Sequence, residues 1–334
     1  MIPLFFRPRP APGTLLLIAA LGLFCSREAS GQEIQELVTA CGGSSQSHTE
    51  LCHRAAAVLE TARGGLGAAA TWGSETPGSA STFGYRLQDF PRIALSTRVG
   101  LSRFSMVKVP TGYANSAPVP EEDIFVPSVH LLGTVAVLNG FSPSPTMGGV
   151  LALDLTVSTH GLFPPGDEGF QQSQWGWGVG ARLGVFRESF TLPGVSLSAT
   201  RRWMGSTEIG DMGDGGAIET DFDLEVTSFR GVFGKDIMGI GLLAGMGWDR
   251  ISGDGRIRAR VSPTGPESSA SASDLASKRR MYFGGASMTF LIAQISTEIG
   301  WSEPVDQELP IDPSGGEFPS NGAYFASLAL RLTF

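Results

Sequence analysis

The amino-acid sequence predicts an all-β fold, a transmembrane antiparallel up-and-down β-barrel of about 12 strands with a short disulfide-bonded helical segment before it. Three observations lead to this prediction. The composition is rich in glycine and aromatic residues and poor in charge, with 45 Gly, 20 Phe and 6 Trp among 334 residues and only 17% charged. Apolar and polar residues alternate with a period of two. The connections between the alternating segments are short and long in turn.

The composition also argues against several other classes of protein. The chain has 24 Lys and Arg against 32 Asp and Glu, and this net charge of −8 argues against a nucleic-acid partner. A hydrophobic content of 42% argues against a disordered chain. A helical membrane protein needs apolar runs of about 20 residues, and only the extreme N-terminus comes near that length.

Residues 1–31 are predicted to be a cleaved secretory signal peptide. A short basic stretch over 7–9 precedes an apolar core over 14–24, and small residues over 29–31 provide a cleavage site. A retained membrane anchor and a lipoprotein processed at Cys25 are the alternatives. Secretion through this signal would place the mature chain in an oxidising compartment.

Residues 32–64 are predicted to form a helical segment, either in the periplasm or in the barrel lumen. Cys41 and Cys52 remain after the signal is removed, and an even pair of cysteines in an exported protein indicates a disulfide. The pattern over 49–62 predicts a helix that ends at the following glycine pair. Two histidines beside the cysteines leave a metal site as an alternative, but the spacing favours the disulfide and we predict no metal.

Residues 65–334 are predicted to form the barrel. The alternation predicts strands near 65–73, 81–88, 92–105, 126–139, 148–160, 173–188, 194–205, 222–233, 238–251, 278–290, 291–302 and 322–334. Apolar side chains on one face suit lipid, and small or polar side chains on the other face suit a lumen. The turn at Phe290-Leu291 has none of the usual turn residues, and without it the even strand count would be lost.

The connections alternate in length, as in barrels with short periplasmic turns and long outer loops. Short connections are expected near 89–91, 140–147, 189–193, 234–237 and 290–291. Long ones are expected near 106–125, 161–172, 206–221, 252–277 and 303–320, where acidic residues far outnumber basic ones. Divalent cations are therefore potential partners of the outer loops, although the charge could equally serve only to keep exposed loops soluble.

The last strand gives the sequence its most specific feature. One face carries alternating apolar side chains that end on an aromatic residue: Tyr324, Leu328, Leu330, Leu332 and Phe334. This strand resembles the C-terminal signature strand of bacterial outer-membrane β-barrel proteins. The resemblance implies that these five residues are an assembly signal and that the protein resides in the cell outer membrane. It also implies outer-membrane lipid and the barrel-assembly machinery as partners.

Strand parity places a set of charged residues in the lumen: Arg86, Arg98, Arg182, Arg331, Asp154, Glu225 and Glu298. Charges held inside a barrel need partners. Two interpretations are open. The residues form a salt-bridge network that closes the lumen, or they line a charged constriction that selects solutes.

A porin-like channel for passive diffusion of small solutes is the function that this reading favours, because about 12 strands leave more room than an eight-stranded barrel. The first alternative is a structural or adhesion protein with a closed lumen and working surface loops. The second is an enzyme acting at the outer rim. The histidines lack the Ser two residues later that outer-membrane lipid hydrolases use, so we expect no enzyme, no catalytic residues and no cofactor.

Overall fold

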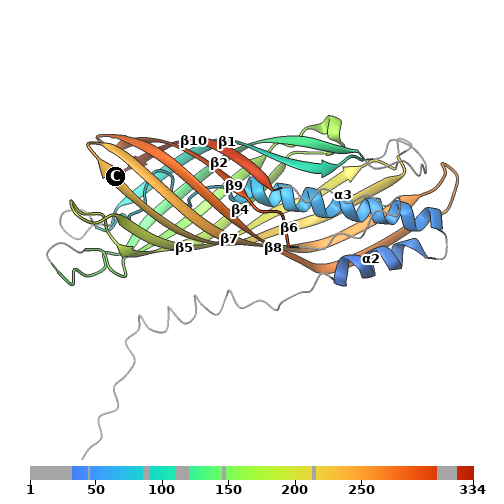
Figure 1. Cartoon of the computed structure of the whole chain (residues 1–334), viewed down its shortest axis with the longest axis horizontal. Coiled ribbons are helices and arrows are strands. Elements are labelled where there is room, and N and C mark those ends of the chain that lie inside the picture. Colours follow the sequence, from blue (N-terminus) through green and yellow to red (C-terminus); the bar gives the residue numbers. More distant parts are fainter. Residues whose placement is uncertain are drawn as a thin grey trace, which may run out of the picture.

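The computed structural model describes residues 32–43, 46–85, 91–109, 120–144, 148–212, 216–306 and 322–334. Antiparallel strands close into one barrel in chain order, with the first strand paired to the last (Figure 1). The strands are β1 (Ile93–Val107), β2 (Glu121–Leu138), β3 (Leu153–Leu162), β4 (Gln174–Phe186), β5 (Gly194–Gly210), β6 (Ile218–Ile237), β7 (Ile240–Arg260), β8 (Glu267–Phe290), β9 (Ala293–Ser302) and β10 (Ala323–Thr333). A closed sheet leaves no unpaired edge within the ring.

The predicted count of 12 strands is wrong, because the described barrel has 10. Residues 65–73, expected as the first strand, continue helix α3 (Gln46–Thr71) and then leave it. Residues 81–85, expected to begin the second strand, contribute only an isolated bridge at Tyr85. The helix also continues past Gly64 and Gly65, where the sequence predicted its end. A helix buried on every side shows no amphipathic period, so this Gly- and Ala-rich run resembled a strand.

The questionable turn after β8 exists. β8 ends at Phe290 and β9 begins at Ala293, and Leu291 adopts a positive φ of 54°. Tight hairpins need positive φ at their central residues, which glycine or asparagine usually supplies. Here Leu291 occupies that conformation and is fully exposed. The turn therefore forms without the glycine or asparagine by which a sequence usually reveals it.

The strands differ greatly in length, so at the end that carries the long connections some strands extend well beyond the others. β3 and β9 have 10 residues, whereas β6, β7 and β8 have 20, 21 and 24. We call the part of β5–β8 beyond their neighbours the outer extension, which comprises residues 205–210, 218–226, 250–260 and 267–278. Much of what the sequence predicted as long loops is therefore sheet, and the acidic residues 219, 221, 254 and 274 lie on strands.

The outer surface of the ring is apolar around its circumference. Its exposed side chains include Ile93, Leu95, Val99, Leu155, Val157, Leu197, Phe233, Leu242, Ile295, Ile299, Leu328 and Leu330. Aromatic side chains border this belt toward the long-loop end. Trp301 lies between Tyr282 and Tyr324 on the neighbouring strands, and Trp177 lies opposite Trp203. From Ile93 to Leu101 the belt spans about nine residues of a tilted strand, the length that a transmembrane β-strand needs.

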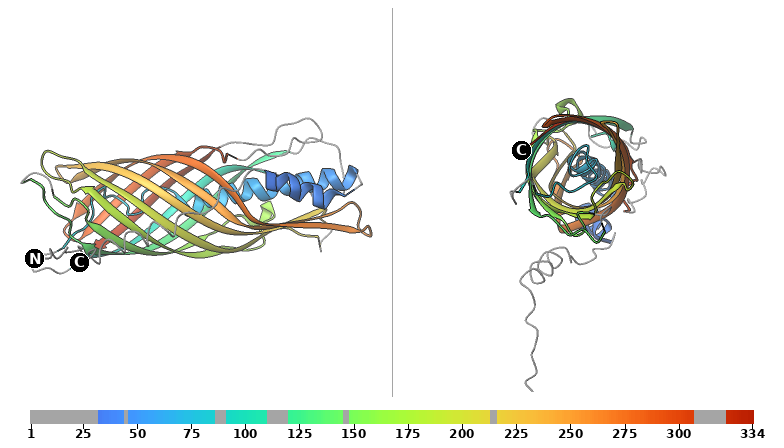
Figure 2. Two further views of the ribbon diagram at one scale, coloured as in Figure 1. Left: turned by 90° about the horizontal axis from the view of Figure 1, so that it is seen from below. Right: turned by 90° about the vertical axis from the view of Figure 1, so that its left-hand side faces the viewer.

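The N-terminal helices occupy the interior and the long-loop end. Helix α3 runs inside the ring, which is clear when the barrel is viewed end-on (Figure 2), and its side chains from residue 54 to residue 71 are buried. Helix α2 (Gln32–Gly42) packs against β7 and β8 in the outer extension. Neither helix is long and apolar enough to cross a membrane.

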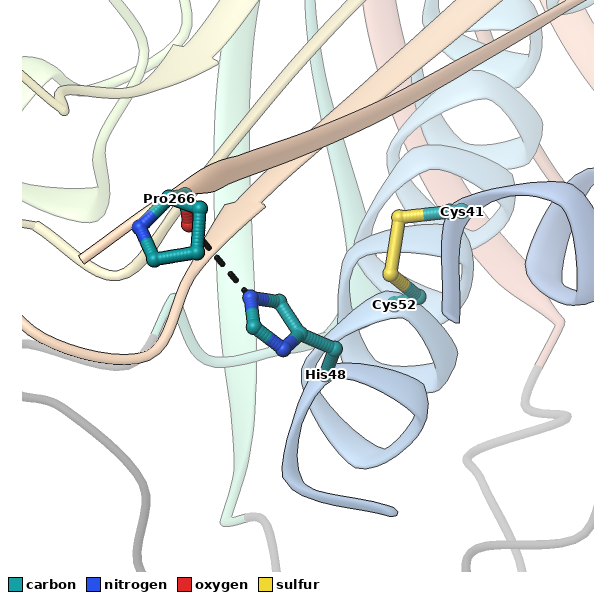
Figure 3. Close-up of a disulfide and its surroundings, with 4 residues drawn as sticks. All are labelled: Cys41, His48, Cys52 and Pro266. Atoms are coloured by element: carbon teal, nitrogen blue, oxygen red, sulfur yellow. Dashed lines mark hydrogen bonds between the residues drawn. A yellow bond between two sulfur atoms is a disulfide. The ribbon is translucent and has the colours of Figure 1, made fainter. Parts of the chain in front are cut away.

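The predicted disulfide is confirmed. Cys41 at the end of α2 is bonded to Cys52 in the second turn of α3, with Cα atoms 5.9 Å apart (Figure 3). His48 lies on the adjacent turn and donates from its imidazole to the carbonyl of Pro266, at 3.4 Å, in the β7–β8 connection. The bond and this contact hold the start of α3 to the long-loop end of the barrel. Phe334 lies at the opposite end, where its backbone pairs with Ile93.

Candidate functional site: the occupied lumen

The lumen is the candidate site because the predicted charged residues converge there. Arg98, Arg182, Arg331, Asp154 and Glu298 all point inward and are buried, at most 7% exposed. They come from β1, β4, β10, β3 and β9. Arg86 lies outside the described residues. The structure thus brings five of the predicted lumen residues into one interior space.

The placement of Glu225 in the lumen is wrong. It lies on the outer face of β6, where its carboxylate contacts Arg201 of β5 at 2.5 Å. Its neighbours Leu224 and Val226 are the inward residues, and both are buried. Within the outer extension the interior is apolar because α3 fills it. Even-numbered residues face inward along β6 from 218 to 232, so the strand keeps one parity and the polarity of its two faces changes: in the outer extension the polar residues face outward.

Helix α3 fills the long-loop half of the lumen by apolar packing. Leu59 and Leu66 belong to a fully buried cluster with inward side chains of the barrel, such as Phe104 and Ile251. The helix approaches the wall so closely that a Cβ on Gly65 would lie 2.1 Å from the Phe104 ring. Glycine therefore replaces larger residues where the wall is nearest, and this explains why a helix tolerates Gly64 and Gly65 in its middle.

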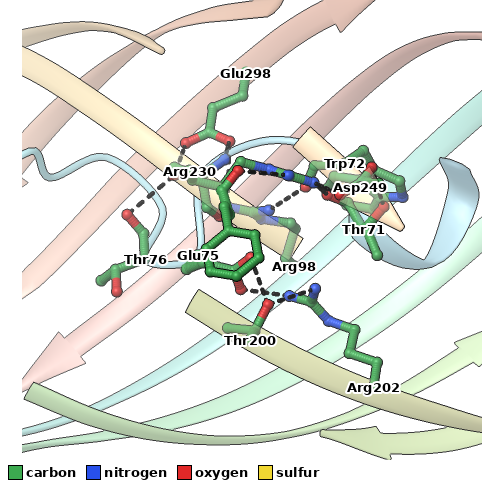
Figure 4. Close-up of polar contacts among 12 residues, drawn as sticks. Thr71, Trp72, Glu75, Thr76, Arg98, Thr200, Arg202, Arg230, Asp249 and Glu298 are labelled. Carbon is green, nitrogen blue, oxygen red and sulfur yellow. Dashed lines mark hydrogen bonds and ion pairs between the residues drawn. The ribbon is translucent and has the colours of Figure 1, made fainter. Parts of the chain in front are cut away.

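The end of α3 is held by a buried charge cluster (Figure 4). Arg279 of β8 donates to the carbonyl of Gly64 at 2.7 Å, and Arg230 of β6 donates to the carbonyl of Thr71 at 2.8 Å. Asp249 of β7 lies between the two guanidinium groups, at 2.7 Å from Arg230 and 3.2 Å from Arg279. The last four carbonyls of a helix lack internal partners and carry partial negative charge, so Arg230 satisfies the carbonyl at the end of α3, while Arg279 adds a contact to the helix two turns earlier.

Residues 72–85, which we call the lumenal segment, continue from α3 without regular structure toward the C-terminal end of the barrel. Arg98 donates to the carbonyls of Trp72 and Ser74 at 3.0 and 2.8 Å. It also contacts Glu298 at 3.2 Å. The same carboxylate accepts the backbone N–H of Ser74 at 2.9 Å. In this ion pair between β1 and β9, the arginine therefore donates to carbonyls of the segment and the carboxylate accepts one of its N–H groups.

Glu75 is the acidic side chain that the lumenal segment sends to the wall. It accepts from the hydroxyl of Thr200 at 3.0 Å and forms an ion pair with Arg202, both on β5 (Figure 4). Glu75 is 6% exposed and Arg202 is 7% exposed. A buried charge is stable only when it is paired, so this pair ties the segment to the wall opposite Arg98.

The rest of the lumenal segment is bound in the same way. Arg331 of β10 donates to the carbonyl of Pro77 at 2.8 Å, and Arg182 of β4 donates to the carbonyl of Ser79 at 3.2 Å. Asp154 of β3 pairs with Arg182 at 2.7 Å and accepts the backbone N–H of Phe83 at 3.1 Å. The wall thus supplies hydrogen-bond partners to backbone groups along the non-helical chain from Trp72 to Phe83, as irregular backbone at membrane depth requires.

One small cavity lies beside this filling. An interior pocket beside Ala68, Arg279 and Phe325 has a volume of about 10 Å³, near the minimum that one water molecule needs. The arrangement can fix a segment inside the barrel through charge and backbone hydrogen bonds.

Sequence reasoning missed several residues that bind the filling: Glu75, Arg202, Arg230, Asp249 and Arg279. Parity could have found Arg202, because it lies two and four residues after Thr200 and Ser198 and shares their inward face of β5. Glu75 could not be found by parity, because it lies on no strand. Its recognition requires knowing that residues 72–85 lie inside the barrel.

The predicted assembly residues lie together on the outside of the barrel. Tyr324, Leu328, Leu330 and Phe334 are 42–58% exposed, and Leu332 is half-buried on the same face of β10. Their role in assembly stays a prediction.

Several acidic residues at the long-loop end have basic partners. Asp123 contacts Arg103 at 2.5 Å, Glu122 contacts Lys108 at 3.0 Å, and Glu267 contacts Arg260 at 3.3 Å. The hydrogen bond from Lys108 lowers the pKa of Glu122. Within the described ranges, no three His, Cys, Asp or Glu side chains are grouped so that they could hold a metal ion. Divalent cations at this end stay a prediction.

No protein-family model and no curated protein matches the chain. Solved structures share its fold. The translocator domain of the autotransporter NalP from Neisseria meningitidis is 9% identical over 73% of this chain and 88% of that domain, with a TM-score of 0.39. The outer-membrane protease OmpT from Escherichia coli is 9% identical over 77% of this chain and all of that one, with a TM-score of 0.35. An outer-membrane channel from Pseudomonas putida F1 is 11% identical over 78% of this chain and all of that one, with a TM-score of 0.31.

These neighbours are bacterial outer-membrane β-barrel proteins, as the C-terminal strand predicted. Their names describe a translocator, a protease and a channel. The shared feature is the closed antiparallel barrel, and at these TM-scores no role is carried over to this chain.

Proposed function

We propose that the protein is an outer-membrane β-barrel whose lumen is closed by its own N-terminal region and which acts through the surface at its long-loop end. A structural or adhesion role therefore takes precedence over the porin-like channel that the sequence favoured. The single observation that carries this proposal is that the N-terminal region occupies the lumen. Helix α3 is held there by apolar packing, and residues 72–85 are held by hydrogen bonds from buried arginines.

The apolar belt and its aromatic border support the membrane location. Trp and Tyr concentrate where a membrane meets water, and here Trp175, Trp203, Trp248, Trp301 and Tyr324 are all at the long-loop border of the belt. Short turns and the C-terminus belong on the periplasmic side, which assigns the long-loop end to the cell surface. Helix α2 and the Cys41–Cys52 disulfide would then lie outside the cell.

The outer extension supplies the surface on which such a protein could act. It projects beyond the aromatic border and carries a cleft of about 400 Å³ whose lining includes Asp221, Asp223, Asp254 and Arg256. This cleft is large enough to receive a side chain or a small group of a partner.

The enzyme alternative has less support. Two of the described histidines, His130 and His160, lie on the inner face of β2 and β3 at the depth of Trp72, and not at the rim. His48 binds a backbone carbonyl. None of these three histidines makes a hydrogen bond to a serine or an aspartate that would pair a base with a nucleophile.

Single-channel recording on the mature protein in planar bilayers tests the proposal. We expect no steady conductance from the wild-type protein. Replacing Arg98 and Arg331 by Ala together removes three hydrogen bonds to lumenal carbonyls and should produce transient openings. A stable open state in the wild-type protein would contradict the proposal and restore the porin-like channel.

A further inference from the structure

One row across the inner face of the barrel brings together two histidines and a methionine. His130 on β2 is opposite His160 on β3, His160 is opposite Gly176 on β4, and Gly176 is opposite Met204 on β5. Residues directly opposite each other in a sheet point to the same face, and all three side chains are buried in the interior. Because Gly176 has no side chain, His160 and Met204 become neighbours across it.

The two imidazoles are short of hydrogen-bond partners. His160 is 0% exposed and His130 is 8% exposed. By strict geometry neither ring nitrogen of His160, nor Nε2 of His130, makes a hydrogen bond with the protein, but the backbone of Trp177 is within reach of the His160 ring and that of Ala69 is within reach of the His130 ring. A metal-binding imidazole usually donates its other ring N–H to a backbone carbonyl in this way. Each neutral ring also presents one acceptor nitrogen, and that nitrogen is left for a ligand from outside the chain.

The distances suit a shared metal ion. The His130 and His160 ring centroids are 5.4 Å apart with an interplanar angle of 50°. Two imidazoles that bind one ion through bonds of about 2.0 Å have centroids roughly 5–6.5 Å apart. A Cβ on Gly176 would lie 2.3 Å from Sδ of Met204 and 3.2 Å from Cδ2 of His160, so the thioether lies beside the second imidazole.

The charge around the row permits a cation. Arg98 and Arg202 are the nearby positive groups, and each has a carboxylate partner, Glu298 and Glu75 respectively. Both arginines nevertheless act on the imidazoles as positive charges, and the three donors themselves are uncharged. The surroundings therefore favour an ion of the lowest charge, a monovalent one, over a divalent one.

We propose that His130, His160 and Met204 form a binding site for a soft monovalent metal ion of the Cu(I) class. Thioether ligands select Cu(I), and imidazole also suits copper, whereas Mg²⁺ and Ca²⁺ require oxygen ligands. The ion would satisfy the unpaired imidazole nitrogens. It would also fix His130, which lies 4.6 Å from the Trp72 ring, at the depth where α3 ends. This site does not depend on whether the barrel conducts.

Anaerobic titration of the full mature protein with Cu(I), in competition with a chromogenic Cu(I) chelator, tests the site. The protein should be refolded with the metal present, because the lumen is closed. We expect one equivalent to bind in the wild-type protein and Zn²⁺ not to compete. Met204→Leu and His160→Asn should each weaken binding by about 10–100-fold or more, at least the loss that follows when a metal's supporting residues are removed.

Met106→Leu is the matched control, because Met106 is equally buried but belongs to the apolar cluster around α3. It should bind Cu(I) like the wild-type protein. Heat-modifiable migration on gels verifies that each variant is folded. X-ray absorption of the wild-type complex, which needs no variant, should show both nitrogen and sulfur ligands. No binding against the chelator, a first shell without sulfur, or unchanged affinity in both ligand variants would overturn the proposal.

Discussion

The two halves of the lumen are filled by the same stretch of chain but by different chemistry. Toward the long-loop end, α3 meets the wall through apolar side chains such as Leu59 and Leu66. Toward the C-terminal end, the lumenal segment meets it through arginine and carboxylate side chains. The change occurs near Thr71, where the helix ends.

Backbone hydrogen bonding explains the difference. A helix satisfies its own N–H and C=O groups except at its ends, so α3 meets the wall mainly through matching shape. Its polar contacts are few, such as the buried Arg63, which pairs with Glu60 and donates to the carbonyl of Leu275. The lumenal segment is not helical, and each of its buried carbonyls needs a donor from the wall. Arginine suits this task because its guanidinium offers five donors and keeps its charge. The arginines in the C-terminal half of the lumen therefore bind the backbone of the lumenal segment.

The largest effect should follow from breaking the charge cluster where the halves meet. Asp249→Asn removes the carboxylate that Arg230 and Arg279 share, leaving two buried cations without compensation. We expect a loss of about 3–5 kcal/mol in the free energy of unfolding, because a broken buried ion pair leaves its partner unpaired. Urea unfolding in lipid vesicles, followed by tryptophan fluorescence, measures this loss.

Asp123→Asn is the matched control for that change. It breaks a pair of similar length with Arg103, but both side chains are more than 40% exposed. An exposed ion pair contributes about 0–1 kcal/mol. Equal losses in the two variants would contradict the view that burial makes the lumenal cluster important.

The sequence was informative where a strand separates lipid from a polar interior. On β1, β3, β4, β9 and β10 the alternation placed Arg98, Asp154, Arg182, Glu298 and Arg331 inward, as the structure has them. Glu225 was misplaced because a polar residue was taken to face the lumen, whereas in the outer extension the inward face packs on an apolar helix and the polar face is outside. Alternation with a period of two shows that a strand has two different faces, but the surroundings of the strand determine which face lies inside the barrel.

The content of the lumen was harder to predict from local patterns. Residues 64–71 are small and apolar, so they lack both the helical period and a clear strand alternation. Their helix is determined by its surroundings, where Gly65 and Gly67 fit against Phe104 and Ile251. The disulfide was predictable because it depends only on compartment and cysteine count. The partners of Glu75 were not, because they arise from strands far away in the chain.

Removing the disulfide should destabilise the filling of the long-loop half of the lumen without affecting that of the C-terminal half. Replacing Cys41 and Cys52 by Ser should destabilise α2 and the start of α3 by about 2–4 kcal/mol, the usual contribution of a disulfide. Hydrogen exchange should speed up at Leu37 and Val38, which pack α2 against the barrel. Exchange at Ser74 and Phe83, whose N–H groups are held by Glu298 and Asp154, should not change. Faster exchange at Ser74 would show that the two halves unfold together.

The smallest effect concerns how closely the apolar half is packed, and neighbouring glycines in α3 provide the comparison. Exchanging Gly for Ala within a helix stabilises it by about 1 kcal/mol. At Gly65 a Cβ would lie 2.1 Å from the Phe104 ring, whereas at Gly64 it would lie 3.2 Å from the Val305 side chain. Overpacking a core costs about 1–3 kcal/mol, so Gly65→Ala should be neutral to destabilising and Gly64→Ala mildly stabilising.

The difference between these two variants is the informative quantity, because both carry the same gain in helix propensity. We expect them to differ by about 1–3 kcal/mol in urea unfolding, the cost of overpacking alone. Adding Phe104→Leu to Gly65→Ala should recover part of the loss, since it removes the ring that the new methyl group meets. If both glycine variants are stabilised equally, then α3 does not lie against Phe104 as described, and shape complementarity is not what holds the apolar half of the lumen.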